Sequence, residues 1–226
     1  TPSPALTEEE RARICETAAE IARAAGYRNA GTVEFIYGRG AFYFLEMNTR
    51  LQVEHPVTEM VTGLDLVEMQ LRVAAGERLA VAQADIRPAG HSIELRVYAE
   101  SAARGFTPTT GPVLALRLPE GEGVRVDAGI AAGQRVTTAF DPMLAKLVVH
   151  APDRHGAIAR ARRALADFAL LGCETNIAFL DRLVADPAFA AGEVHTGWLD
   201  AHPDLAAEPE PPPEARRMLA AVAALV

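Results

Sequence analysis

The spacing of apolar residues predicts a helix near the start of the chain. They recur at intervals of three and four residues, the period of one helical face: Ile14, Ala18, Ile21, Ala22 and Ala25. Thr7 and Glu10 form a capping-box signature before this run, and Gly26 is suited to end the helix. A second helix is predicted within residues 62–77, with a capping box from Asp65 and Glu68 and a stop at Gly76.

Between these two helices the pattern predicts a β-hairpin. Two β-rich runs, "TVEFIY" and "AFYFLEMN", flank the short loop Gly38-Arg39-Gly40. We expect a three-residue loop in which Gly38 pairs with Phe42. In that register Ile36 faces Phe44 and Glu34 faces Glu46.

From about Gly90 onward, short alternating runs predict an antiparallel β domain with two packed helices. In "HSIELRVYAE", Ile93, Leu95 and Val97 lie on one side. Four further β runs follow: "PVLALRL", "GVRVDAG", "RVTTAF" and "MLAKLVVHA". The segments 153–172 and 175–189 then have the pattern of helices. The fold class expected is α+β.

The composition is that of a globular protein, and it argues against nucleic acids and membranes as partners. The chain has 226 residues, of which 50% are hydrophobic and 23% charged. A net charge of −8 argues against broad nucleic-acid binding, which needs a basic surface. No apolar run is long enough to span a membrane, and the opening "TPSPALTEEE" is unlike a signal peptide, so we expect a cytoplasmic protein without membrane contact. Cys15 and Cys173 have no metal-type spacing and are expected to be reduced core residues.

A row of polar residues follows the hairpin in "EMNTRLQVEHP". If this stretch is extended, alternate side chains share one face: Glu46, Asn48, Arg50, Gln52 and Glu54. Arg50 supplies a planar fork suited to a small oxyanion, and Glu54 is a candidate general base. The following His55 is interpreted as a turn residue without a chemical role.

Glu34 and Glu46, placed opposite each other, would have Cβ atoms roughly 5 Å apart and would repel. Three interpretations stay open: a solvated surface, a shared proton, or a hard divalent cation that also takes the amide oxygen of Asn48. Ile36, Phe42 and Phe44 are expected on the same face, which makes simple exposure less favourable. An anion site beside a metal site is typical of phosphoryl transfer to a small acid.

These segments together resemble the second half of the biotin carboxylases. Residues 34–77, which include "EMNTRLQVEHPVTE", are similar to the end of the family's ATP-grasp region. The runs "GHSIELRVYAE", "FDPMLAKLVVHA" and "TNIAFLDRLVADPAFAAGEVHTGWLD" are similar to its C-terminal domain, and the likeness extends from about residue 2 to 200. The resemblance implies three parts: an ATP-grasp end in 1–84, the C-terminal domain in 85–200, and a proline-rich acidic linker with a terminal helix in 201–226.

The resemblance also assigns roles by position in the motif. It implies three ligands for Mg²⁺ or Mn²⁺: Glu34, Glu46 and Asn48. It implies three bicarbonate-binding residues, the last through its backbone: Arg50, Gln52 and Val53. Glu54 would be the base that deprotonates bicarbonate, and Arg96 would stabilise the biotin enolate, so that Arg50, Glu54 and Arg96 form the catalytic set.

The implied enzyme is a ligase that carboxylates biotin with ATP and bicarbonate through carboxyphosphate. The biotin would be carried by a separate carrier protein or domain, with a carboxyltransferase as a further partner and a homodimer as the expected assembly. The family's N-terminal domain, glycine-rich lid and ATP-binding lysines have no counterpart here, so the chain alone is expected to be inactive. Two alternatives stay open: a non-catalytic dimerisation or assembly fragment, and another ATP-grasp ligase related to carbamoyl-phosphate synthetase.

Overall fold

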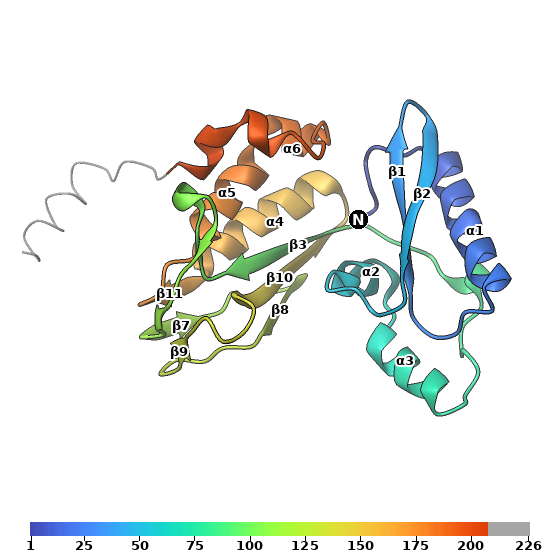
Figure 1. Cartoon of the computed structure of the whole chain (residues 1–226), viewed down its shortest axis with the longest axis horizontal. Coiled ribbons are helices and arrows are strands. Elements are labelled where there is room, and N and C mark those ends of the chain that lie inside the picture. The colour runs from blue at the N-terminus through green and yellow to red at the C-terminus, as the bar shows by residue number, and fades with distance from the viewer. Residues whose placement is uncertain (208–226) are drawn as a thin grey trace, which may run out of the picture.

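The computed structural model describes residues 1–207. The first part of the predicted linker, residues 201–207, lies within this range and contains the end of one short 3₁₀ helix and all of another, whereas the rest of the linker and the predicted terminal helix lie outside it. Two groups of elements lie side by side in Figure 1. The N-terminal group contains the helices α1 (Glu8–Ala24), α2 (His55–Thr62) and α3 (Leu66–Ala74) and the hairpin strands β1 (Thr32–Gly38) and β2 (Ala41–Asn48). Within residues 1–207, no helix is both long and apolar enough to cross a membrane.

The predicted helix starts are confirmed, with one correction. The Thr7 side chain accepts from the Glu10 amide while the Glu10 carboxylate accepts from the Thr7 amide, a complete capping box at the start of α1. At α3 the Asp65 side chain caps the Glu68 amide, but the Glu68 carboxylate accepts from Arg72 instead of completing a box. The short helix α2 was not predicted.

The register of the hairpin differs from the prediction near its loop and agrees with it at the glutamates. Gly38 pairs with Ala41, not Phe42, because the loop has two residues, Arg39 and Gly40, which both have positive φ. A bulge between Glu34 and Phe35 then shifts the register, so that Glu34 pairs with Glu46 as expected. The predicted loop was one residue too long and the bulge was not predicted. These two errors offset each other, so the predicted pairing of Glu34 with Glu46 is correct.

The bulge also corrects which apolar residues share a face with Glu34. Ile36 pairs with Tyr43, not Phe44, and both side chains of this pair are exposed. Phe44 pairs with Phe35 instead, on the opposite face of β1, where the Phe35 ring lies 5.3 Å from Phe42 between centroids. This opposite face carries α1, since the Tyr37 hydroxyl donates to Glu10.

A three-stranded antiparallel sheet forms the centre of the second group. Its order is β3 (His91–Tyr98), β10 (Met143–Ala151), β8 (Val124–Ala128). Strands β4 (Glu100–Ser101) and β5 (Thr107–Pro108), β6 (Gly111–Pro112) and β9 (Arg135–Val136), and β7 (Ala115–Arg117) and β11 (Ala169–Leu171) form further antiparallel pairs. The short 3₁₀ helices are η1 (Gln83–Asp85), η2 (Ala102–Arg104), η3 (Leu199–Ala201) and η4 (Pro203–Ala206).

Helices α4 (Arg154–Asp167), α5 (Ile177–Ala185) and α6 (Pro187–Ala191) lie together above this sheet in Figure 1. The predicted alternation of β3 is confirmed: Ile93, Leu95 and Val97 are buried in the core between the sheet and α4 and α5. The predicted α+β class is therefore confirmed. Of the two cysteines, Cys173 is buried as expected, but Cys15 is exposed, so its assignment to the core was wrong.

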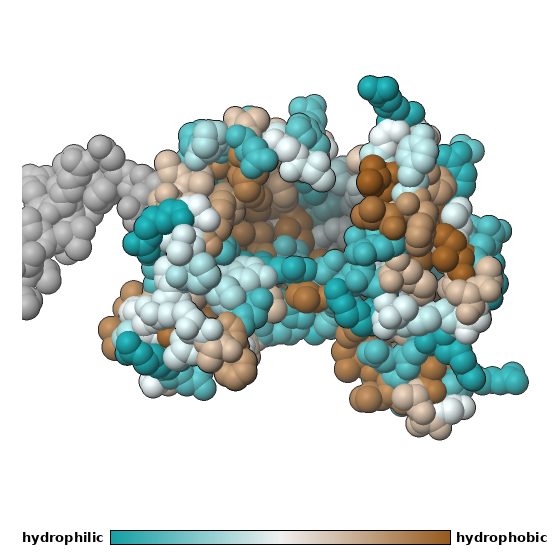
Figure 2. All heavy atoms as spheres, viewed as in Figure 1, coloured by the Kyte–Doolittle hydropathy of each residue, from teal (hydrophilic) through white to brown (hydrophobic). Residues whose placement is uncertain are grey.

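The hairpin exposes apolar side chains on the face turned away from α1. Ile36 and Tyr43 are 59% and 65% exposed, and Leu45 at the bulge is 54% exposed. Hydrophobic atoms gather over this part of the molecule in Figure 2, beside hydrophilic atoms along the boundary between the two groups. The polar residues of the candidate site lie along that boundary.

Replacement of Leu147 by Ala tests the core of the sheet. Leu147 is fully buried in β10, so we expect Leu147→Ala to lower the free energy of unfolding by about 2–5 kcal/mol. Leu114→Ala is the matched control, because that leucine is 71% exposed, and should cost less than about 0.5 kcal/mol. Urea unfolding of both variants makes the comparison, and similar losses would contradict the core described here.

Candidate active site

The polar row "EMNTRLQVEHP" is extended only in its first part. Strand β2 ends at Asn48, residues 49–54 form a loop, and α2 begins at His55. The prediction of one continuous strand face is therefore wrong beyond Asn48. The loop nevertheless turns its polar side chains back toward the hairpin.

Glu34 and Glu46 converge at the end of the hairpin and share one hydrogen-bond donor. The Asn48 Nδ2 atom lies 2.7 Å from Glu34 Oε1 and 3.3 Å from Glu46 Oε1. The two carboxylates therefore meet around a single point, which a donor occupies in this arrangement. Two carboxylates and an amide oxygen fit a hard divalent cation, and Asn48, whose Oδ1 faces Arg50, would have to turn that oxygen toward the carboxylates to complete the set. Within residues 1–207 no three His, Cys, Asp or Glu side chains gather to hold a metal, so a cation here needs Asn48 or ligands from a substrate.

The loop places Arg50 directly beside these carboxylates. Arg50 Nη1 donates to Gln52 Oε1 at 2.5 Å, and Gln52 Nε2 in turn donates to Glu34 Oε1 at 3.2 Å. Arg50 Nη2 lies 3.4 Å from Asn48 Oδ1. The guanidinium is held by neutral oxygens rather than by a carboxylate, so its positive charge stays available to an anion.

Glu54 and Arg96 meet across the boundary between the two groups of elements. Arg96 Nη2 donates to Glu54 Oε2 at 2.6 Å, a strong charge-assisted bond between residues 42 positions apart in the chain. Arg96 lies on β3, on the sheet face opposite Ile93 and Leu95. The predicted side chains thus form two contacting sets, one of Glu34, Glu46, Asn48, Arg50 and Gln52 and one of Glu54 and Arg96, joined by the loop 49–54.

Asn176 fixes the strand that carries Arg96, and sequence reasoning missed it. Its amide is buried and fully satisfied: Oδ1 accepts from the Tyr98 amide at 2.9 Å, and Nδ2 donates to the Arg96 carbonyl at 3.1 Å and to Glu100 at 2.9 Å. Because β3 is an edge strand, this side chain occupies hydrogen-bonding positions that a further strand would fill. Nothing in the local sequence distinguishes this asparagine from an ordinary turn residue.

Lys146 is a second residue that sequence reasoning missed. It lies on β10 between Arg96 of β3 and Asp127 of β8 in the pairing register. Its Nζ atom donates to the Val53 carbonyl at 3.1 Å and lies 3.4 Å from Asp127 Oδ2. Burial raises the pKa of Asp127, but bonds from Arg125 and the charges of Arg125 and Lys146 outweigh it and bring that pKa below its usual value. Lys146 therefore faces a carboxylate.

Glu59 ties α2 and α3 to the sheet. Its side chain is 8% exposed and accepts from Arg125 Nη1 at 2.6 Å and from the Leu66 amide at 2.7 Å. Arg125 also makes two bonds to Asp127, at 2.8 and 2.9 Å. His55 lies nearby, with Nδ1 2.8 Å from the Gln52 carbonyl oxygen, so it contacts the loop.

Two family models match adjoining parts of the chain. Residues 94–201 match the biotin carboxylase C-terminal domain, and residues 1–82 match the ATP-binding domain of the carbamoyl-phosphate synthase L chain. The junction between the two matches falls just before Arg96, where the two groups of elements meet.

Among curated proteins, the chain is 48% identical over 202 residues to biotin carboxylase 2 of Bacillus subtilis, covering 89% of this chain and 45% of that protein. It is 49% identical over 202 residues to the biotin carboxylase of Halalkalibacterium halodurans, covering 89% and 44%. The chain thus spans less than half the length of these relatives.

A solved structure shares the fold. The biotin carboxylase domain dimer of Hydrogenobacter thermophilus 2-oxoglutarate carboxylase, in complex with MgADP, ADP and bicarbonate, superposes with a TM-score of 0.90. It is 43% identical, and the match covers 93% of this chain and 47% of that one. The biotin carboxylase subunit of a pyruvate carboxylase also matches with a TM-score of 0.90, at 41% identity over 93% of this chain and 47% of its own.

Replacement of Glu59 by Gln tests the contact between α2, α3 and the sheet. The change removes a buried charge that faces Arg125, so we expect the free energy of unfolding to fall by about 2 kcal/mol or more. Glu68→Gln is the matched control, because Glu68 pairs with Arg72 in solvent, and should change it by less than about 0.5 kcal/mol. Equal effects in urea unfolding would show that the Glu59 pair does not join these elements.

Proposed function

The chain belongs to the biotin carboxylase family, and we propose that it supplies the bicarbonate-activating half of the active site of an ATP-dependent biotin carboxylase. The observation that carries this proposal is the placement of three features on the hairpin, the loop 49–54 and strand β3. These are the paired carboxylates Glu34 and Glu46, the fork of Arg50, which has no carboxylate partner among the described residues, and the contact between Glu54 and Arg96. These features are suited to a reaction in which a phosphoryl group is transferred to a small anion and a base accepts a proton from that anion.

Arg50, Gln52 and the Val53 backbone would bind bicarbonate. A guanidinium presents two parallel N–H groups at the spacing of two carboxyl oxygens. Arg50 has no carboxylate partner among the described residues, so an incoming anion does not have to displace one. Gln52 bridges Arg50 and Glu34, which would place the anion next to the metal carboxylates.

Glu54 would take the proton of bicarbonate, so that a bicarbonate oxygen attacks the γ-phosphorus of ATP and ADP leaves. The product, carboxyphosphate, breaks down to CO2 and phosphate. Phosphate would then remove the N1′ proton of biotin, and the enolate that remains would attack CO2. Arg96, next to Glu54, would stabilise the negative oxygen of that enolate.

Glu34, Glu46 and Asn48 fit a divalent cation, Mg²⁺ or Mn²⁺, and would hold it at the end of the hairpin. When bound, such a cation neutralises charge on the ATP phosphates and on the two facing carboxylates. The Asn48 Nδ2 atom donates to both glutamates, which keeps the two side chains directed at the same point.

The remaining parts of the proposal concern the surroundings of this site. Biotin would arrive on a carrier protein or domain, a carboxyltransferase would use the product, and a homodimer is the proposed assembly. We also propose the division into 1–84, 85–200 and 201–226 and a cytoplasmic location. The alternative of a carbamoyl-phosphate synthetase relative is less favoured, because residues 94–201 match the biotin carboxylase C-terminal domain.

Variants of Arg50 and Glu54 test the proposed roles in a full-length carboxylase, in which these 226 residues follow the segment that precedes them in the relatives. We expect Arg50→Ala to lower kcat/KM for bicarbonate at least a hundredfold, roughly 2.7 kcal/mol. Arg50→Lys should recover only part of this, since Lys lacks the planar fork. Glu54→Gln should keep the fold and lose the base, with kcat falling at least a hundredfold.

ATP hydrolysis is measured against bicarbonate concentration, and circular dichroism checks the fold. Arg39→Ala is the control, because Arg39 lies in the hairpin loop at the opposite end of β1 and β2. Wild-type turnover at limiting bicarbonate in either site variant would refute the role given to that residue.

The isolated chain of 226 residues should fold but not carboxylate free biotin at a useful rate. Its sheet and helices enclose their own core, whereas turnover needs ATP, cation, bicarbonate and biotin held together. We expect bicarbonate- and biotin-dependent ATP hydrolysis to lie more than tenfold below that of the full-length carboxylase, measured side by side. Turnover within about tenfold, roughly 1.4 kcal/mol, would contradict the idea that the chain holds only half a site.

A further inference from the structure

Lys146 is the only lysine among the 22 lysine and arginine residues of the sequence. Its side chain is 13% exposed, and it points to the loop that carries the proposed bicarbonate residues. Everywhere else in the chain a positive charge is supplied by arginine. This single position combines a compact ammonium group, near-complete burial and contact with the site.

The pairing register explains why a charge at this position needs compensation. Lys146 lies directly opposite Arg96 across β10 and β3, and two like charges in such a pair destabilise a sheet. Asp127, opposite Lys146 on β8, supplies one negative charge at 3.4 Å. Glu94, two residues before Arg96 on the same strand face, supplies another, with its Oε1 3.5 Å from Arg96 Nε.

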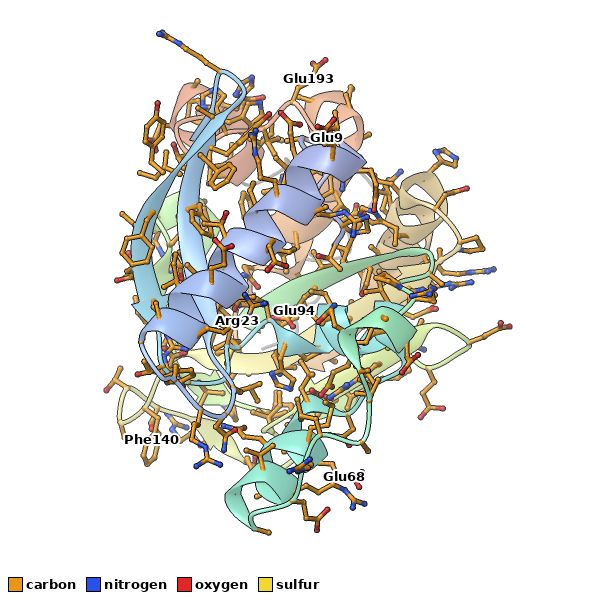
Figure 3. All side chains as sticks on the ribbon, turned by 90° about the vertical axis from the view of Figure 1, so that its right-hand side faces the viewer. Glu9, Arg23, Glu68, Glu94, Phe140 and Glu193 are labelled. Atoms are coloured by element: carbon orange, nitrogen blue, oxygen red, sulfur yellow. The ribbon has the colours of Figure 1, made fainter. Side chains whose placement is uncertain are left out.

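Glu94 is held in the interior without a hydrogen bond. Its side chain is 5% exposed, and among the described residues it is the only one with buried side-chain oxygens that lack a hydrogen-bond partner. Burial raises the pKa of Glu94, and the charges of Lys146 and Arg96 oppose that rise. In the view of Figure 3, Glu94 lies near the middle of the molecule, whereas Glu193 and Glu68 lie toward its top and bottom. A buried carboxylate in this place is explained by the two cations beside it.

The Val53 carbonyl is the group of the loop that Lys146 contacts. Lys146 Nζ donates to it at 3.1 Å, and among the described residues no other side chain of the sheet bonds to that carbonyl. The neighbouring bond from Arg96 to Glu54 fixes the next residue of the loop. Two cations of adjacent strands thus hold two successive loop residues, one by its backbone and one by its carboxylate.

We propose that Lys146 is a positioning residue that holds the Val53 backbone, and with it the loop 49–54, in the conformation that binds bicarbonate. This inference rests on the proposed function. An ammonium group directs its three donors apart, so it can reach the Val53 carbonyl and Asp127 at the same time while it stays close to Glu94. Lys146 does not touch bicarbonate or ATP in this proposal and acts only through the loop.

The test is a set of variants in the full-length carboxylase. Lys146→Met keeps the length of the side chain and removes its donors, and we expect the KM for bicarbonate to rise at least tenfold. The KM for ATP should change less than twofold and kcat at saturating bicarbonate less than threefold, since bicarbonate can still order the loop. Lys146→Arg can still donate to a carbonyl, so its KM for bicarbonate should be at least threefold lower than that of Lys146→Met.

Arg162→Met is the matched control, because Arg162 makes an exposed ion pair with Asp181 on the helices behind the sheet. It should leave all three constants within twofold of the parent. A folded Lys146→Met variant with an unchanged KM for bicarbonate would overturn the proposal, as would an equal rise in the KM values for bicarbonate and ATP. Absence of bicarbonate-dependent turnover in the parent itself would instead refute the proposed function.

A measurement on the unaltered protein covers the case in which Lys146→Met does not fold. Labelling the isolated chain of 226 residues with ¹⁵N-lysine gives a single side-chain resonance, because its sequence has one lysine. We expect the Nζ protons of that lysine to be protected from exchange in the folded chain. A resonance that exchanges freely in the folded chain would show that Lys146 does not hold the loop.

Discussion

The position of the candidate site depends on charge pairing across the boundary between the N-terminal elements and the β3–β10–β8 sheet. One face of this sheet packs on α4 and α5 through apolar residues, and the other presents Glu94, Arg96, Lys146, Arg125 and Asp127 to α2 and the loop 49–54. Buried charges are costly unless each has a partner. The partners of Arg125 and Arg96 include Glu59 and Glu54, which come from the other group of elements. The pair of Arg125 with the buried Glu59 contributes little net stability and restricts the geometry strongly, which is what a site assembled from two groups requires.

The sequence predicts best those features that depend on neighbouring residues. The capping box at Thr7, the alternation of β3 and the antiparallel sheet all follow from local patterns, and all are present. The hairpin shows where such reasoning stops. A two-residue loop needs positive φ at both central positions, and the pair Arg39-Gly40 is a weak signal for it, because arginine rarely adopts that conformation. The bulge at Glu34 and Phe35 has no local signature, yet it brings Glu34 opposite Glu46.

The residues that sequence reasoning missed act over long separations in the chain. Lys146 reaches Val53 across 93 residues, Asn176 reaches Arg96 across 80, and Arg125 reaches Glu59 across 66. Periodicity and spacing carry no information about such contacts. The composition gave one indication of Lys146. A single lysine in a sequence whose other Lys/Arg positions are all arginine suggests a position where arginine does not serve equally well. The likeness to the family guided the assignment of Arg96, whose position on a polar strand face alone indicates no chemistry.

The contact between Glu54 and Arg96 has a chemical consequence if the proposed roles hold. The base that takes the proton of bicarbonate and the cation that stabilises the enolate of biotin lie 2.6 Å apart, so the two half-reactions share one small volume. CO2 released from carboxyphosphate then forms within reach of the nucleophile that captures it, and proximity of this kind accounts for much of an enzyme's rate. The same pair also balances its own charge before the substrates bind. Entry of an anion beside Arg50 and development of an enolate beside Arg96 each add negative charge next to Glu54. Arg50 and Arg96 offset that charge, and Lys146 holds the Val53 carbonyl in the loop that carries Glu54.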